Sequence, residues 1–350
     1  MAPQEPTAGE ARAAAPAAGR RQVWRRLLAR RTARAAGLVI ALLLLIAVAA
    51  PLLSAIEGQD PTSYHNDLLD SAAGGVPTGS LGGVSADHWL GVEPGTGRDV
   101  FARLVHGARL SLLVAVGATV VQVTIGVLLG LAAGLGSRLL DQLIGNTTEV
   151  MLALPSLVFA ISLMAVVPAD FPRPLLLTLV IGLLGWAGTS RLVRAQTLSL
   201  RQLDYVAAAR LAGAGRWRIA RRELLPALAA PVITYAAILL PSNVVSEAGL
   251  SFLGVGVKPP TSSWGQMLSG ATTWFRADPM YVLLPSAVLF ATVLAFTVLG
   301  DAVRTELDPR AASRLRVGAA RQAAASPTGP PTGPSVGLPV GLPADEEATA

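Results

Sequence analysis

The chain is built from long runs of apolar residues without charges, separated by segments that hold most of its arginines and acidic residues. The first run, Ala35–Ile56, has 22 residues. As an α-helix it would extend about 33 Å, enough to cross a hydrocarbon core of about 30 Å. Five further runs follow: Leu110–Gly136, Val150–Val167, Leu175–Ser190, Ala227–Val245 and Tyr281–Gly300. The pattern predicts an all-α integral membrane protein with six transmembrane helices.

Two of these runs carry additional information. Arginines precede the first run, as in a signal peptide, but the run is longer than a typical signal sequence and more spans follow it. We therefore expect Ala35–Ile56 to be retained as a transmembrane helix. The fourth run contains Gly182, Gly185 and Gly188, and small residues of this kind favour close packing between helices.

Composition excludes an ordinary soluble enzyme. Hydrophobic residues make up 52% of the 350 residues and charged residues 14%, against about 25% charged residues in a typical soluble domain. The chain has no cysteine, which excludes disulfides, thiolate metal sites and a cysteine nucleophile.

The net charge of +6 is unevenly distributed. Residues 1–34 and residues 191–223 each carry eight arginines against two acidic residues, whereas residues 57–109 carry three arginines against seven. Because cytoplasmic loops are enriched in arginine and lysine, both termini and the loop 191–226 are predicted to be cytoplasmic. Residues 57–109 and 246–280 are predicted to face outward.

These boundaries define the expected organisation. We predict a cytoplasmic basic tail (1–34), a first transmembrane helix (35–56), an extracytoplasmic loop (57–109), a five-helix core (110–303) that includes the loop 191–226, and a cytoplasmic tail (304–350). The last tail is expected to be disordered from about residue 322, because its Ala, Pro, Gly, Ser and Thr residues cannot bury enough apolar surface to offset chain entropy.

The cytoplasmic loop contains two helical segments, Tyr205–Leu211 and Arg216–Leu225, with Gly213 and Gly215 between them as a turn. Three interpretations compete: a basic loop on anionic headgroups, a helix-turn-helix contacting DNA, and a docking element for a cytoplasmic partner. DNA binding is disfavoured, because spans four and five hold both ends of the loop near the membrane. The residues alone leave lipid and partner open.

A family resemblance favours the partner. The loop resembles the EAA loop of binding-protein-dependent ABC importer permeases, although Ala207 stands where that family usually has Glu. The resemblance implies that the loop docks on an ATP-binding subunit, with Gly213 allowing the turn and Ile219 offering an apolar contact. The residues that carry it, and to which we assign coupling, are Tyr205, Ala208, Ala209, Gly213, Ile219, Leu225 and Pro226.

Other segments narrow the resemblance to one branch of that family. Residues 247–268 are similar to the signature after span five of peptide and nickel permeases, in the C-type half of the permease pair. Residues 88–112 resemble the segment that leads into span two of that half, with one extra residue, and residues 300–310 resemble the C-terminal end. The resemblance implies a bacterial cell membrane, a homologous second permease, two ATP-binding cassette subunits and an extracytoplasmic substrate-binding protein as partners.

The search for chemistry identifies no catalytic residue and no metal site. A P-loop requires Gly-Lys-Ser/Thr, but the only lysine, Lys258, follows Val257, so ATP would be bound by partner subunits and this chain would need no cofactor of its own. The three histidines lack metal-ligand spacing. Glu247 is the exception among polar residues: it ends an apolar span, and because an acid at membrane depth usually faces a cavity or a partner, it is a candidate for lining the translocation pathway.

The predicted function is therefore ATP-driven import of di- or oligopeptides or related small solutes, with the energy supplied by partner subunits and no nucleic-acid binding. Two alternatives are an ion-gradient-coupled secondary transporter and a membrane-anchored scaffold. A secondary transporter would usually have acidic residues on several spans, whereas Glu247 is almost the only acidic residue at the predicted spans of this chain. The sequence does not specify the substrate.

Overall fold

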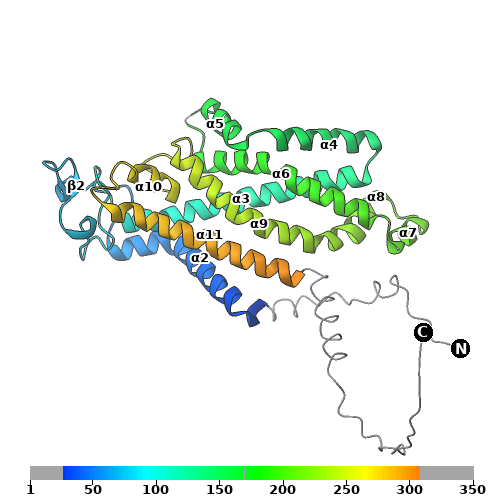
Figure 1. Ribbon diagram of the computed structural model, residues 1–350, viewed down its shortest axis with the longest axis horizontal. Coiled ribbons are helices and arrows are strands. Elements are labelled where there is room, and N and C mark those ends of the chain that lie inside the picture. Colours follow the sequence, from blue (N-terminus) through cyan, green and yellow to red (C-terminus); the bar gives the residue numbers. More distant parts are fainter. Residues whose placement is uncertain (1–26, 169, 308–350) are drawn as a thin grey trace, which may run out of the picture. The chain divides into compact units, whose positions relative to one another are not determined.

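A computed structural model describes residues 27–168 and 170–307. The predicted tail beyond residue 307, with its expected disorder, and residues 1–26 of the basic N-terminal tail lie outside this range. Five stretches of the described residues are long and apolar enough to cross a membrane, or six if a bent helix pair counts as one span. The long helices are α2 (Arg31–Glu57), α3 (Val100–Leu135), α6 (Arg173–Leu200), α9 (Leu225–Phe252) and α11 (Pro279–Leu307) (Figure 1). The chain is thus a helical, multi-pass membrane protein.

Helix α3 is the centre of the described fold and packs most extensively against α6, α2 and α9. Glycines allow the close approach of α3 and α6. A Cβ atom on Gly130 would lie 2.6 Å from Cβ of Val193, and one on Gly182 would lie 2.6 Å from Cγ1 of Val121. The predicted close packing around the glycines of the fourth run is confirmed.

The third apolar run differs from its prediction. Instead of one span over 150–167, the structure has α4 (Arg138–Ala153) and α5 (Ser156–Val166), which meet at 90°. The bend lies at Leu154 and Pro155, because the residue before proline is pushed toward extended conformations and proline itself has no N–H to donate. Residues 138–149, which lie between the second and third apolar runs, are therefore helical.

Two other helices extend past the charged residues that border their apolar runs. Helix α3 begins at Val100, not Leu110, and the Asp99 carboxylate caps it by accepting the N–H of Ala102 at 2.6 Å. The predicted loop 57–109 is thus too long by ten residues at this end. Helix α6 continues to Leu200, so the first ten residues of the predicted loop 191–226 are helical.

The two ends of the helices carry different structures (Figure 1). One end holds α10 (Trp264–Ala271) and the segment 58–99, and the other holds α7 (Asp204–Leu211) and α8 (Arg216–Ile219). A π-helical turn, η4 (Ala220–Leu224), joins α8 to α9. The segment 58–99 contains the short elements η2 (Asn66–Leu68), β1 (Leu69–Asp70), β2 (Val76–Pro77) and η3 (Ser80–Gly82), of which β1 and β2 pair antiparallel.

Candidate functional site

The predicted coupling loop forms two short helices joined by a tight turn. Helix α7 ends at Leu211, and the N–H groups of Gly213 and Ala214 donate to the carbonyls of Arg210 and Ala209 at 2.9 and 3.0 Å. Gly213 has φ +79°, in the left-handed region that only glycine adopts without cost. The helix–glycine–helix arrangement predicted from the sequence is therefore present.

Buried apolar side chains fix this loop to the long helices. Val206 of α7 and Ile219 of α8 are 0% and 3% exposed and pack with Leu224 and with Val193 of α6. The side chain of Ile219 therefore attaches the loop to its own chain, and its predicted contact with a partner stays a prediction.

A different set of apolar residues is exposed on the same loop. Leu211 is 92% exposed, Trp217 75% and Tyr205 43%. Leu211 follows the buried Val206 by five residues, which places it about 140° away around the helix. This difference in phase along the sequence is the signal that Leu211 faces away from the buried side of α7. Among the other predicted coupling residues, Ala209 is half-buried, and the exposed ones are Ala208, Gly213, Leu225 and Pro226.

Helix α9 connects this loop to the opposite end of the molecule. Together α8, η4 and α9 form one stretch, Arg216–Phe252, that is a candidate membrane span. About three quarters of the way along it, the buried side chain of Asn243 donates to Thr119 Oγ1 at 2.8 Å and to Gln122 Oε1 at 3.0 Å, both on α3. Gln122 in turn donates to the carbonyl of Ile181 on α6 at 3.0 Å. We call Thr119, Gln122 and Asn243 the amide clasp, because they connect three helices inside the apolar region.

Glu247 lies further along α9 and is 0% exposed. Its Oε1 accepts the hydroxyl of Ser251 at 2.8 Å, and the Ser251 hydroxyl oxygen accepts the N–H of Val257 at 3.1 Å. Its Oε2 has no hydrogen-bond partner among the described residues. Glu247 thus holds the turn after α9 through Ser251, and its role in lining a translocation pathway stays a prediction.

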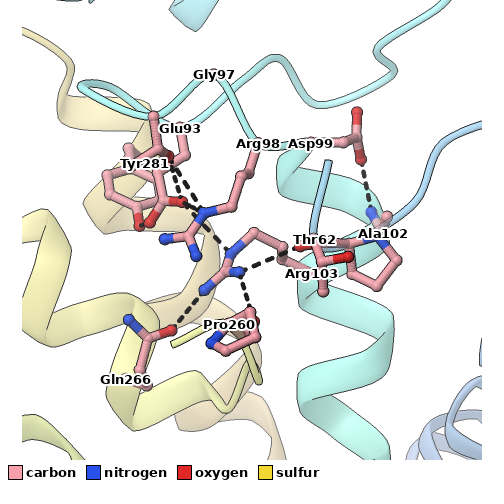
Figure 2. A network of polar contacts seen from close by, with 12 residues as sticks. Thr62, Glu93, Gly97, Arg98, Asp99, Ala102, Arg103, Pro260, Gln266 and Tyr281 are labelled. Atoms are coloured by element: carbon pink, nitrogen blue, oxygen red, sulfur yellow. Dashed lines mark hydrogen bonds and ion pairs between the residues drawn. The ribbon is translucent and has the colours of Figure 1, made fainter. Parts of the chain in front are cut away.

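A second polar cluster lies at the same end as α10 (Figure 2). The Glu93 carboxylate accepts Arg98 Nε at 2.6 Å and the hydroxyl of Tyr281 on α11, and Arg103 Nε lies 3.5 Å from it. Arg103 also donates to Gln266 of α10 at 2.5 Å. We call Glu93, Arg98, Arg103, Gln266 and Tyr281 the outer ion cluster; all five side chains are buried. Burial alone would raise the pKa of Glu93, but Arg103, the Tyr281 hydroxyl and Arg98 together hold it below its ordinary value.

Neighbouring contacts attach the segment 58–99 to the ends of two helices. Asp99, which caps α3, also lies 2.9 Å from Nδ1 of His88. The N–H of Trp89 donates to Glu57, the last residue of α2, at 2.9 Å. In residues 27–168 and 170–307, no group of three or more His, Cys, Asp or Glu side chains is arranged to hold a metal ion.

Comparison with known proteins places these features among transport permeases. Residues 126–313 match the model of the binding-protein-dependent transport system inner membrane component, and residues 20–70 match the N-terminal TM domain of oligopeptide transport permease C. The chain is 35% identical to the glutathione transport system permease protein GsiD of Pectobacterium atrosepticum, over 83% of this chain and 91% of that protein. It is 34% identical to the dipeptide transport system permease protein DppC of Alkalihalophilus pseudofirmus, over 83% and 90%, and 36% identical to the di/tripeptide transport system permease protein DppC of Pseudomonas aeruginosa, over 77% and 86%.

Proposed function

The chain belongs to the binding-protein-dependent transport system inner membrane components, a family of non-catalytic ABC transporter permeases, and we propose that it carries di- or oligopeptides or related small solutes into a bacterial cell. The names of its relatives, which include glutathione, dipeptide and di/tripeptide permeases, support a peptide substrate. The proposed fold has six spans, with the bent pair α4–α5 as the third and an EAA-type loop between the fourth and fifth.

The observation that carries the proposal is the exposed apolar surface of α7 and α8. Buried Val206 and Ile219 hold the two helices on the membrane-spanning bundle, while Leu211 and Trp217 remain exposed. Large apolar residues exposed on a rigid element are typical of a protein interface. We propose that Tyr205, Leu211 and Trp217 contact an ATP-binding subunit, next to the EAA-loop positions Ala208, Gly213, Leu225 and Pro226.

The mechanism follows from how this surface is connected. The chain contains no P-loop, so ATP binds to partner subunits, and their closure on nucleotide moves the docked loop. Because α8, η4 and α9 are continuous and the amide clasp ties Asn243 to α3 and α6, a displacement of the loop moves several spans as a rigid group. Nucleotide favours one arrangement only by its differential affinity for the two states.

Orientation and partners complete the proposal. We propose that the arginine-rich residues 1–34 and loop 191–226 lie in the cytoplasm and the acidic segment before α3 outside; with six spans, the C-terminal end lies on the same side as the N-terminal end. With this topology the outer ion cluster stabilises the face that meets the substrate-binding protein, and α7–α8 face the cytoplasm. The complete importer would contain a homologous second permease and two ATP-binding subunits, in a surrounding bilayer.

Substitution of the exposed apolar residues tests the coupling surface. Leu211→Glu and Trp217→Glu should abolish co-purification of the ATP-binding subunits and ATP-dependent peptide uptake, because each places a charge in an apolar interface. Leu139→Glu is a matched control, since Leu139 is 78% exposed but lies on α4, outside the loop. Membrane levels of all three variants should equal wild type.

Two results would contradict the proposal. Retained association and uptake in both loop variants would show that α7 and α8 are not the docking surface. Uptake in proteoliposomes that needs an ion gradient and no ATP would show a secondary transporter. Vanadate-sensitive uptake by the wild-type complex is the expected result.

A further inference from the structure

A groove runs over α3 between α2 and the beginning of α6. Its volume is about 770 Å³, and its walls come from Leu44 and Val48 of α2, Leu113 and Val116 of α3, and Leu175 of α6. These side chains are between 41% and 79% exposed. Apart from Arg109 at one end and Thr178, every side chain that lines the groove is apolar or glycine.

The end of this groove nearest the outer segment is cationic. Arg109 lines the groove and also an adjoining pocket of about 380 Å³, together with His106 and Thr62. Arg109 is exposed and has no ion pair or hydrogen bond with any residue in the described ranges. Next to this adjoining pocket lies a further pocket, and Pro260 and Thr261 line both. The further pocket is also lined by Arg173 and Lys258, and Asp170 is its only acidic residue.

These cations contrast with the rest of the outer face. The segment 57–109 is acidic overall, and two of its three arginines, Arg98 and Arg103, are buried in the outer ion cluster. The remaining one, Arg109, lies at the mouth of the apolar groove. The exposed arginine of this segment therefore lies where the groove opens.

The length of the groove matches one leaflet of a bilayer. Arg109 and Gly117 mark its two ends along α3 and are eight residues apart, or about 12 Å at 1.5 Å per residue. Half of a hydrocarbon core is about 15 Å. With Arg109 at headgroup level, the groove ends near the middle of the membrane.

We propose that this groove binds an anionic glycerophospholipid of the outer leaflet, with its phosphate at Arg109 and an acyl chain between α2 and α6. An apolar wall of one-leaflet length with a free cation at its outer end matches an acyl chain with a charged headgroup. It does not match a peptide, whose backbone groups would find almost no hydrogen-bond partner along the deep part of the groove. The site goes beyond the proposed function and does not depend on which solute is transported.

Native mass spectrometry of the intact importer, titrated with phosphatidylglycerol and with phosphatidylcholine, tests this site. Wild type should retain phosphatidylglycerol in preference. Arg109→Gln should lower the apparent affinity for phosphatidylglycerol about fivefold, the effect typical of one cation near a membrane surface, and leave phosphatidylcholine binding unchanged. Val116→Trp, which fills the groove from an exposed position, should reduce binding of both lipids.

Arg276→Gln is the matched control, because Arg276 is a cation of the same outer end that lines none of these pockets. It should bind both lipids as wild type does, and ATPase activity should show that every variant is assembled. Equal phosphatidylglycerol binding in wild type, Arg109→Gln and Val116→Trp would overturn the proposal. So would a photocrosslinker at Leu113 that captures the second permease instead of lipid, or an Arg109→Gln variant whose only change is a raised KM for peptide.

Discussion

Replacement of Glu93 by glutamine tests whether the outer ion cluster holds the outer segment in place. The substitution keeps the shape of the side chain and removes its charge. Arg98 and Arg103, which are 3% and 0% exposed, would then lack their shared anion. We expect segment 58–99 to open locally far more often, while the membrane-spanning helices remain folded.

The size of the effect follows from the contacts that remain. Breaking a buried ion pair by removing one partner costs about 3–5 kcal/mol. Arg103 keeps Gln266 and the carbonyls of Pro61 and Pro260 as acceptors, at 2.5–3.3 Å. The lower end, about 3 kcal/mol, is therefore expected, which corresponds to a roughly 150-fold increase in the population of the open state.

The absence of cysteine from the chain gives a direct assay. Val92 is 1% exposed, so a thiol introduced by Val92→Cys is labelled only when the segment opens. In that background Glu93→Gln should accelerate labelling by about two orders of magnitude. Glu93→Gln combined with Arg98→Gln should be slower than Glu93→Gln alone, because the double variant restores the net charge of the cluster. A wild-type labelling rate in Glu93→Gln would refute the reasoning.

Three further predictions concern other parts of the fold. Because the pKa of Glu93 is lowered by folding, the contribution of Glu93 to the stability of the outer segment should be fully present above the ordinary carboxyl value of 4.5 and be lost as the pH drops below it. Pepsin cleavage in this acidic range should increase along that decline in wild type more steeply than in Glu93→Gln. Gly130→Ala should lower the thermal midpoint, because its Cβ would lie 2.7 Å from the Ser190 carbonyl oxygen, whereas Gly37→Ala, with nothing within 4 Å, should raise it slightly. Asn243→Leu should destabilise the protein by about 1–3 kcal/mol in thermal unfolding, because it leaves the other two members of the amide clasp without their partner.

The apolar runs predicted the helices well but not their ends, and the reason is the same at two sites. Arg109 and Arg191 border two of the predicted spans, yet both helices continue past them, with Arg103 also inside α3 and Arg194 inside α6. Arg103 is neutralised by Glu93 and by Gln266, which is 163 residues away, and Arg194 forms two contacts of 2.5 and 2.8 Å with Asp141. Arg109 and Arg191 themselves are exposed. Hydropathy along the chain does not distinguish a helix that continues through exposed or distantly paired charges from one that ends at them.

The turn between α7 and α8 could be predicted from the sequence, because a glycine between two helical segments adopts the turn through its own backbone conformation. The exposed surface of α7 and α8 could not, because it depends on which of their side chains pack against the long helices. Ile219 and Trp217 are two residues apart on one short helix, yet the first is buried against α6 and α7 and the second is 75% exposed. The resemblance to the EAA loop identifies positions with a role in the loop. It does not tell whether a side chain packs inside the chain or contacts a partner.

Substitution of Ile219 should therefore loosen the loop, whereas substitution of Trp217 should leave the loop folded and weaken docking. Resistance of α7–α8 to protease should separate the two roles.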